Sequence, residues 1–179
     1  SFSPIPSFSG TFDGMGYEIN NLLISSAVKI NNVFHVAMFG ENNGTITNLF
    51  GGGNYAGNEY TTNITINDGT ITTLYGGGDN GDVGDAKINI YGGTFKSLIY
   101  GGGNAGNAQD INLLFDGATS KNDIYGGGNK GSCNEVVLEM KSGSTTGNVF
   151  GGGYQGFTKK TRLTVSGALI NQNIYGGGN

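Results

Sequence analysis

Apolar and polar side chains alternate in several short stretches of the chain. Apolar residues occupy every second position in these stretches, which are residues 88–90, 111–115, 136–140 and 163–165. A period of two places alternate side chains on opposite faces of a β-strand, one buried and one in water. No segment shows the 3.6-residue period of a helix over ten residues. The pattern therefore predicts an all-β fold.

A second apolar signal closes each repeat: an aliphatic residue, then Tyr or Phe, then three glycines. A Gly-containing turn separates this phrase from the alternating stretch before it, so each unit holds two strands, with a third short strand near the glycines as an alternative. The aromatic residue recurs every 25 positions without drift, at Phe50, Tyr75, Tyr100, Tyr125, Phe150 and Tyr175. So strict a period indicates a repeat architecture in which equivalent residues stack from one unit to the next.

The length of the unit selects among repeat folds. Propeller blades need about 40 residues, and isolated hairpins could not bury these side chains. One turn of a β-helix fits, with coils about 4.8 Å apart and parallel pairing between them. We therefore predict a parallel β-solenoid of about 25 residues per coil as a single domain over 1–179. Residues 1–50 would form opening coils, and 51–179 would form five coils plus the start of a sixth.

The first of these coils is out of phase by one residue. Its strand residues Ile64 and Ile66, and its loop residue Gly57, are all shifted relative to the later coils. Because a slip of one residue turns a strand inside out, we expect the loop of this coil to absorb the extra residue.

Composition excludes several classes of protein. Gly accounts for 36 of the 179 residues, but not at every third position, which excludes collagen. The formal net charge is −4 and there is no Lys/Arg run beyond Lys159-Lys160, so nucleic acid is not an expected partner. The apolar stretches are far shorter than the ~20 residues that span a bilayer. The single Cys133 cannot form an internal disulfide or a metal site by itself.

Two columns of equivalent residues are expected to run along the axis. Asn or Asp follows every glycine triplet except the one before Tyr154. This predicts an amide ladder that satisfies turn backbone groups, at Asn54, Asp79, Asn104 and Asn129. The aromatic residues allow two interpretations. They either stack within the scaffold or form an exposed stripe that binds a glycan or a second solenoid face, with Tyr75, Tyr100, Tyr125 and Tyr175 as its residues.

A third column collects acids, at Asp85, Asp110 and Glu135, flanked by Tyr60 and Lys160. Carboxylates on successive coils would lie about 5 Å apart, which suits a retaining glycosidase pair or oxygen ligands for calcium. The alternative is a solvated column of charged side chains in a loop.

Calcium is the one cofactor considered, and its candidate ligands are Asp79, Asp82 and Asp85. No catalytic triad can be assembled around the only histidine, His35, which is expected to lie in a strand.

The opening of the chain resembles a known family. The phrase from Phe8 to Ile24, with Gly10-Thr11-Phe12-Asp13-Gly14 at its centre, is followed by Met38-Phe39-Gly40 and by 44–49. This pattern is similar to the GLUG-type repeats of bacterial cell-surface proteins, which include adhesins and non-catalytic parts of surface peptidases. The later Tyr-Gly-Gly-Gly-Asn units resemble Gly-rich repeats of large extracellular bacterial proteins. The resemblance implies a right-handed β-helix and a location at the cell surface.

Two classes of function follow as expectations. The first is a non-catalytic extracellular solenoid that serves as a stalk, an adhesive surface or a filament subunit. Its partners would be glycans, proteins or further copies, stacked end to end or side by side. The second is a polysaccharide lyase, hydrolase or glycan-binding β-helix that uses Asp85, Asp110 and Glu135. The sequence stops within a repeat phrase, at 176–179, and we expect it to be an excerpt of a longer chain or a stacking subunit.

Overall fold

The computed structural model describes residues 28–30, 33–35, 45–55 and 61–179. Contacts divide the chain into two compact units, Ser1–Thr45 and Ile46–Asn179. In the first unit, β1 (Val28–Ile30) and β2 (Val33–His35) form an antiparallel pair. His35 therefore lies in a strand, as predicted. Most of the predicted opening coils at 1–50 lie outside the described residues.

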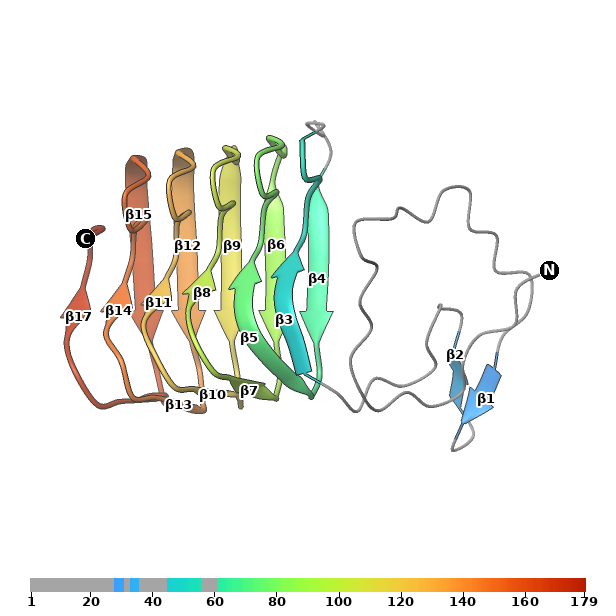
Figure 1. Ribbon diagram of the computed structural model, residues 1–179. Coiled ribbons are helices and arrows are strands. Elements are labelled where there is room, and N and C mark those ends of the chain that lie inside the picture. Colours follow the sequence, from blue (N-terminus) through green and yellow to red (C-terminus); the bar gives the residue numbers. More distant parts are fainter. Residues whose placement is uncertain (1–27, 31–32, 36–44, 56–60) are drawn as a thin grey trace. The chain divides into compact units, whose positions relative to one another are not determined.

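The second unit is built on five long parallel strands, one for each coil (Figure 1). From β6 onward, each long strand pairs with its equivalent in the next coil in constant register, so that Leu113 lies beside Leu138 and Leu138 beside Leu163. The strands are β4 (Thr62–Ile66), β6 (Ala86–Ile90), β9 (Asp110–Phe115), β12 (Cys133–Met140) and β15 (Thr158–Val165).

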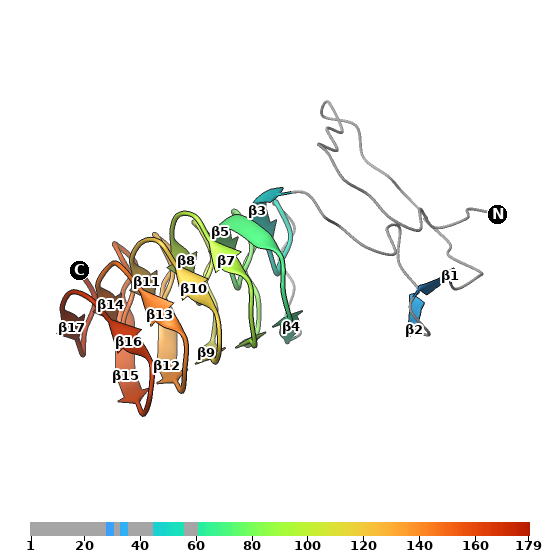
Figure 2. The same cartoon turned by 90° about the horizontal axis from the view of Figure 1, so that it is seen from below.

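A second parallel sheet carries the return path of each coil (Figure 2). It starts with two continuous strands, β3 (Thr45–Phe50) and β5 (Thr70–Tyr75). In the later coils, each return path is divided into two short strands. These are β7 (Thr94–Phe95) and β8 (Ile99–Tyr100), β10 (Thr119–Ser120) and β11 (Ile124–Tyr125), β13 (Ser144–Thr145) and β14 (Val149–Phe150), and β16 (Leu169–Ile170) and β17 (Ile174–Tyr175).

The prediction of a parallel β-solenoid is confirmed. The described residues of this unit contain strands and no helix, wound into about 5 turns of roughly 25 residues each. Consequently no helix in this part of the chain could cross a membrane. The right-handed sense of the coil stays a prediction.

The phase shift of the first coil is corrected in the return path. Residues Thr62 and Ile71 pair with Ala86 and Phe95, one residue short of the full period, whereas Leu74 pairs with Ile99 at the full period. Between Ile71 and Leu74 the chain has two residues, where the next coil has three, 96–98. The missing corner residue keeps β5 continuous, and the extra residue in each later coil divides the strand.

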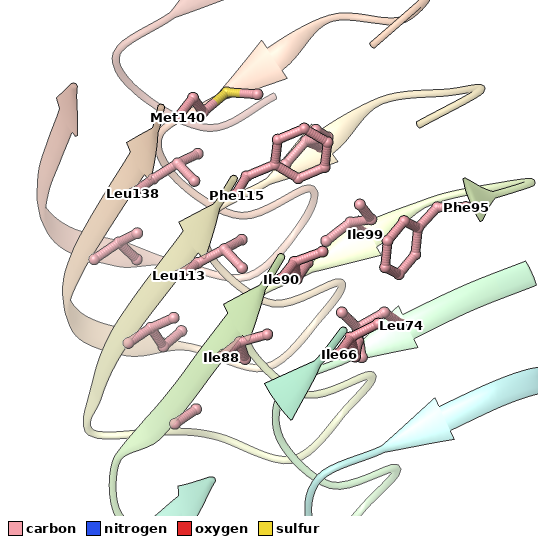
Figure 3. Packing of buried hydrophobic residues seen from close by; sticks show 14 of the residues in the cluster. Ile66, Leu74, Ile88, Ile90, Phe95, Ile99, Leu113, Phe115, Leu138 and Met140 are labelled. Atoms are coloured by element: carbon pink, nitrogen blue, oxygen red, sulfur yellow. The ribbon is translucent and has the colours of Figure 1, made fainter. Parts of the chain in front are cut away.

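The core fills the space between the two sheets. From the long strands, Ile88, Leu113 and Leu138 point inward in one column and are at most 2% exposed. From the return path, Phe95 and Ile99 face them and are fully buried (Figure 3). Complete burial of such a side chain stabilises the fold by about 1.5–3 kcal/mol. The apolar positions of the alternating stretches therefore form the inner face of the long strands.

The glycine triplets bring the backbones of neighbouring coils into direct contact. A Cβ atom on Gly76 would overlap the carbonyl oxygen of Gly101, and a Cβ atom on Gly101 would overlap that of Gly126. The Gly101 amide donates instead to the carbonyl of Tyr125, at 2.9 Å. Only glycine leaves room for this approach.

Candidate functional site

The aromatic residues form one continuous stack along the outside of the return path, which we call the aromatic column. Successive ring centroids lie 4.7 to 5.2 Å apart, and their planes are inclined by no more than 15°. The members are Phe50, Tyr75, Tyr100, Tyr125, Phe150 and Tyr175. The coil spacing itself therefore sets the stacking distance.

The rings in the middle of the column are covered. Tyr100 is 3% exposed and Tyr125 is 2% exposed, whereas Tyr75 is half-buried and Tyr175 is 45% exposed. Both faces of the Tyr100 and Tyr125 rings are occupied by neighbouring rings, so no face is open to stack on a sugar. For these two residues the packing favours the scaffold stack over the exposed binding stripe.

Burial changes the acidity of the phenols. Removal from water disfavours the charged phenolate, and it raises the pKa of Tyr125 to about 12. The nearby carboxylate of Asp123 acts in the same direction. The pKa values of Tyr75 and Tyr100 are raised above the ordinary value chiefly by burial as well. These hydroxyl groups therefore stay protonated at physiological pH.

The residues after the glycine triplets form an amide ladder beside the aromatic column. The Asn104 Nδ2 donates to Asp79 Oδ1 at 2.7 Å, and the Asn129 Nδ2 donates to Asn104 Oδ1 at 2.7 Å. The next member is Tyr154 instead of Asn, and its ring meets Tyr125 edge-on, with centroids 5.5 Å apart. Each amide thus bonds to the coil before it, until Tyr154 ends the series.

Sequence reasoning missed two further ladders. In one, Asp123 Oδ1 accepts hydrogen bonds from the backbone and side chain of Asn148, and Asn148 Oδ1 accepts from Asn173. In the other, Asp82 accepts from the Asn107 amide, and Asn107 Oδ1 accepts from the Ser132 amide. The 25-residue spacing was visible, but the mixed residue types of these columns concealed them. Each of the two begins with Asp, which only accepts when ionised.

The acidic column lies at the start of the long strands. Register places Glu135 opposite Asp110 on one side and opposite Lys160 on the other. The Lys160 Nζ pairs with Glu135 Oε1 at 2.9 Å, and Asp85 Oδ1 accepts the Asp110 amide at 3.3 Å. Its predicted neighbour Tyr60 lies outside the described residues. The column thus places the three acids on successive coils, with the carboxylate of Glu135 held in an ion pair.

The carboxylates of the three calcium candidates all accept hydrogen bonds within the solenoid, and calcium binding stays a prediction. Asp79 is bonded to the side chains of Asn80 and Asn104, while Asp82 and Asp85 each accept a backbone amide from the following coil. Among the residues that the structure describes, no three His, Cys, Asp or Glu side chains form a group that could hold a metal ion.

The single cysteine, Cys133, is buried in the solenoid. Its thiol lies 3.4 Å from Thr158 Oγ1, and burial raises the pKa of the thiol.

The amide ladder gives a pH-dependent prediction. In Asn129→Asp, the new carboxylate would face Asn104 Oδ1, so an acceptor would meet an acceptor. We expect a loss of about 1–3 kcal/mol at pH 7. The contact disfavours the ionised form in the folded state, so the loss should disappear as the pH falls below the ordinary Asp pKa of about 3.9. Urea unfolding at pH 7 and pH 3 measures the difference.

The matched control adds the same charge where no ladder runs. Asn112 lies on the outward face of β9 and is exposed, so Asn112→Asp should leave stability within about 0.5 kcal/mol at both pH values. Equal losses in the two variants would show that charge, and not the ladder contact, sets the cost.

Comparison of the chain with protein-family models, with curated proteins and with solved structures finds no significant match. The resemblance of 8–49 to GLUG-type repeats therefore stays a prediction.

Proposed function

We propose that the chain is a non-catalytic structural element: a rigid β-solenoid that serves as a stalk or adhesive surface of a bacterial cell-surface protein, outside the cell. The proposal rests on the hydrogen bonds of the polar columns. The side chains of Asp79, Asn104, Asp123 and Asn148 form hydrogen bonds to the neighbouring coil. Groups that hold the coils together in this way are poorly placed to bind and turn over a substrate.

Stiffness is the property that such an arrangement supplies. Ring stacks, amide ladders and parallel sheets all run in one direction, along the axis. Bending the solenoid would open several of them at once, since coils are in contact only with their neighbours. A spacer that holds an attached domain or a binding surface at a fixed distance needs this property.

Electron microscopy of the purified chain tests the structural role. We expect straight particles of constant width, and a screen against polysaccharides should give no turnover. Filaments in the micrographs would support end-to-end stacking, and retention on a glycan array without turnover would support adhesion. Particles that collapse or bend freely would count against a rigid spacer. An antibody against the chain should label intact cells of the source organism if the protein lies at the surface.

A second candidate, a polysaccharide lyase or hydrolase, is favoured by one observation. The register of β9 and β12 places the carboxyl groups of Asp110 and Glu135 on adjacent strands. Turnover of a polysaccharide that is lost in both Asp110→Asn and Glu135→Gln would establish this function and overturn the structural one. Matched substitution of the outward-facing Asn112 to Ser should leave any such turnover unchanged.

A further inference from the structure

Departures from the repeat mark one place in the solenoid. Only one coil has an acidic residue two positions before its aromatic residue, namely Asp123 before Tyr125. The residues equivalent to Asp123 in the other coils are Asn48, Thr73, Leu98, Asn148 and Asn173. In the amide ladder, only one member is aromatic, Tyr154, where the others are Asn54, Asp79, Asn104, Asn129 and Asn179. The repeat scaffold requires neither residue, because the other coils do without them.

Both departures meet at Tyr125. Its hydroxyl donates to Asp123 Oδ2 at 3.3 Å. The ring of Tyr154 meets it edge-on, inclined by 72°. Tyr125 itself is 2% exposed, whereas Tyr154 is 37% exposed and reaches solvent. A buried phenol therefore has a proton acceptor on one side and a solvent-exposed aromatic ring on the other.

This combination suits one-electron chemistry. Removing an electron from a phenol makes its hydroxyl strongly acidic, so oxidation proceeds readily only where a base takes the proton. A base within hydrogen-bond reach of that proton meets this need. Burial keeps Tyr125 protonated at physiological pH, so direct oxidation of a phenolate is not the route.

We propose that Asp123, Tyr125 and Tyr154 form a site that quenches one-electron oxidants. The oxidant, an outer-sphere one-electron acceptor in solution, takes one electron from Tyr125 through the exposed ring of Tyr154. The O–H bond of Tyr125 breaks and its proton passes to Asp123 Oδ2. The products are a neutral phenoxyl radical, a neutral carboxyl group and the reduced oxidant, so that charge and electrons balance.

The aromatic column then protects the radical. Tyr100 and Phe150 cover the two faces of the Tyr125 ring, at centroid distances of 5.2 and 4.7 Å. Coupling with a second radical or reaction with a solute requires access that this burial denies. A radical at Tyr125 should therefore outlive one on an exposed tyrosine.

Flash photolysis of the purified chain with ruthenium(III) tris-bipyridine as the oxidant tests the proposal, with freeze-quenched electron paramagnetic resonance to follow phenoxyl radicals. The unmodified chain should give a short-lived and a long-lived population. Tyr125→Phe should abolish the long-lived one, and Asp123→Asn should slow its formation by about a hundredfold. Tyr154→Asn should slow it as well. These variants copy Phe150, Asn148 and Asn129 of neighbouring coils, so the fold should be kept, which circular dichroism checks.

The control is Tyr91→Phe, because Tyr91 is 50% exposed and lies outside the aromatic column. It should reduce the short-lived population alone. A long-lived population that survives in Tyr125→Phe, or that forms at the unmodified rate in Asp123→Asn, would overturn the proposal and leave Asp123 as the first member of its amide ladder. An unchanged rate in Tyr154→Asn would remove Tyr154 from the site.

Discussion

Gly101→Ala is expected to destabilise the solenoid by about 3 kcal/mol or more, because overpacking against backbone cannot be relieved by rotating a side chain. The added Cβ would overlap the carbonyl oxygen of Gly126 in the next coil. To make room, the coils would have to separate, which would stretch the hydrogen bond from the Gly101 amide to the Tyr125 carbonyl. Urea unfolding followed by circular dichroism measures the loss.

The same column provides the control. A Cβ on Gly176 would meet no atom within 4 Å, so Gly176→Ala should change the free energy of unfolding by no more than about 0.5 kcal/mol. If both variants unfold at the same urea concentration, the glycine triplets are not there for close approach. The pair thus separates packing between coils from the general effect of adding a methyl group.

Tyr100→Ala is the second change with a large expected effect, a loss of about 3–5 kcal/mol. Tyr100 is 3% exposed, and its ring stacks on Tyr75 at 5.1 Å and on Tyr125 at 5.2 Å. Removing it would leave a void in the middle of the aromatic column and expose a face of each neighbour. Thermal and urea unfolding should both report the loss.

Tyr100→Phe distinguishes the ring from its hydroxyl group. Phe50 and Phe150 already occupy equivalent positions in the aromatic column, so this variant should cost less than about 1 kcal/mol. A loss as large as that of Tyr100→Ala would mean that the phenolic hydroxyl, and not ring stacking, stabilises the column.

The coil and its long strands could be predicted because they rest on local patterns. An inward column such as Ile88, Leu113 and Leu138 repeats both the strand period and the 25-residue period. Burial of one strand face produces the alternation of apolar and polar residues, and stacking of equivalent residues produces the fixed repeat length. Pattern alone was therefore sufficient for the fold class and for the number of residues in a coil.

Exposure of the aromatic column could not be predicted in this way. Alternation places Ile99 inward and Tyr100 outward, and outward positions normally meet water. Here the outward ring is buried by the rings above and below it, so both residues are almost fully covered. The coil spacing follows from the parallel pairing of the strands, but whether the rings cover one another also depends on ring orientation, which the sequence pattern does not give.

The corner at which the return path divides and the mixed ladders could not be predicted, for related reasons. A single residue at the corner 96–98 decides whether the strand continues as in β5 or divides into β7 and β8, and strand propensity does not register that difference. A column such as Asp123, Asn148 and Asn173 is recognised only when hydrogen bonds are compared, because its first member differs in chemistry from the others.

The uniform step of these ladders has a consequence for how the protein gains and loses its structure. The bonds from Asn104 to Asp79 and from Asn148 to Asp123 each join residues 25 positions apart. Folding can thus nucleate at one pair of coils and propagate outward, with each completed coil acting as a template for the next. A lesion in a middle coil would divide the cooperative unit into two blocks that melt independently, whereas a lesion in an outer coil would only fray one end.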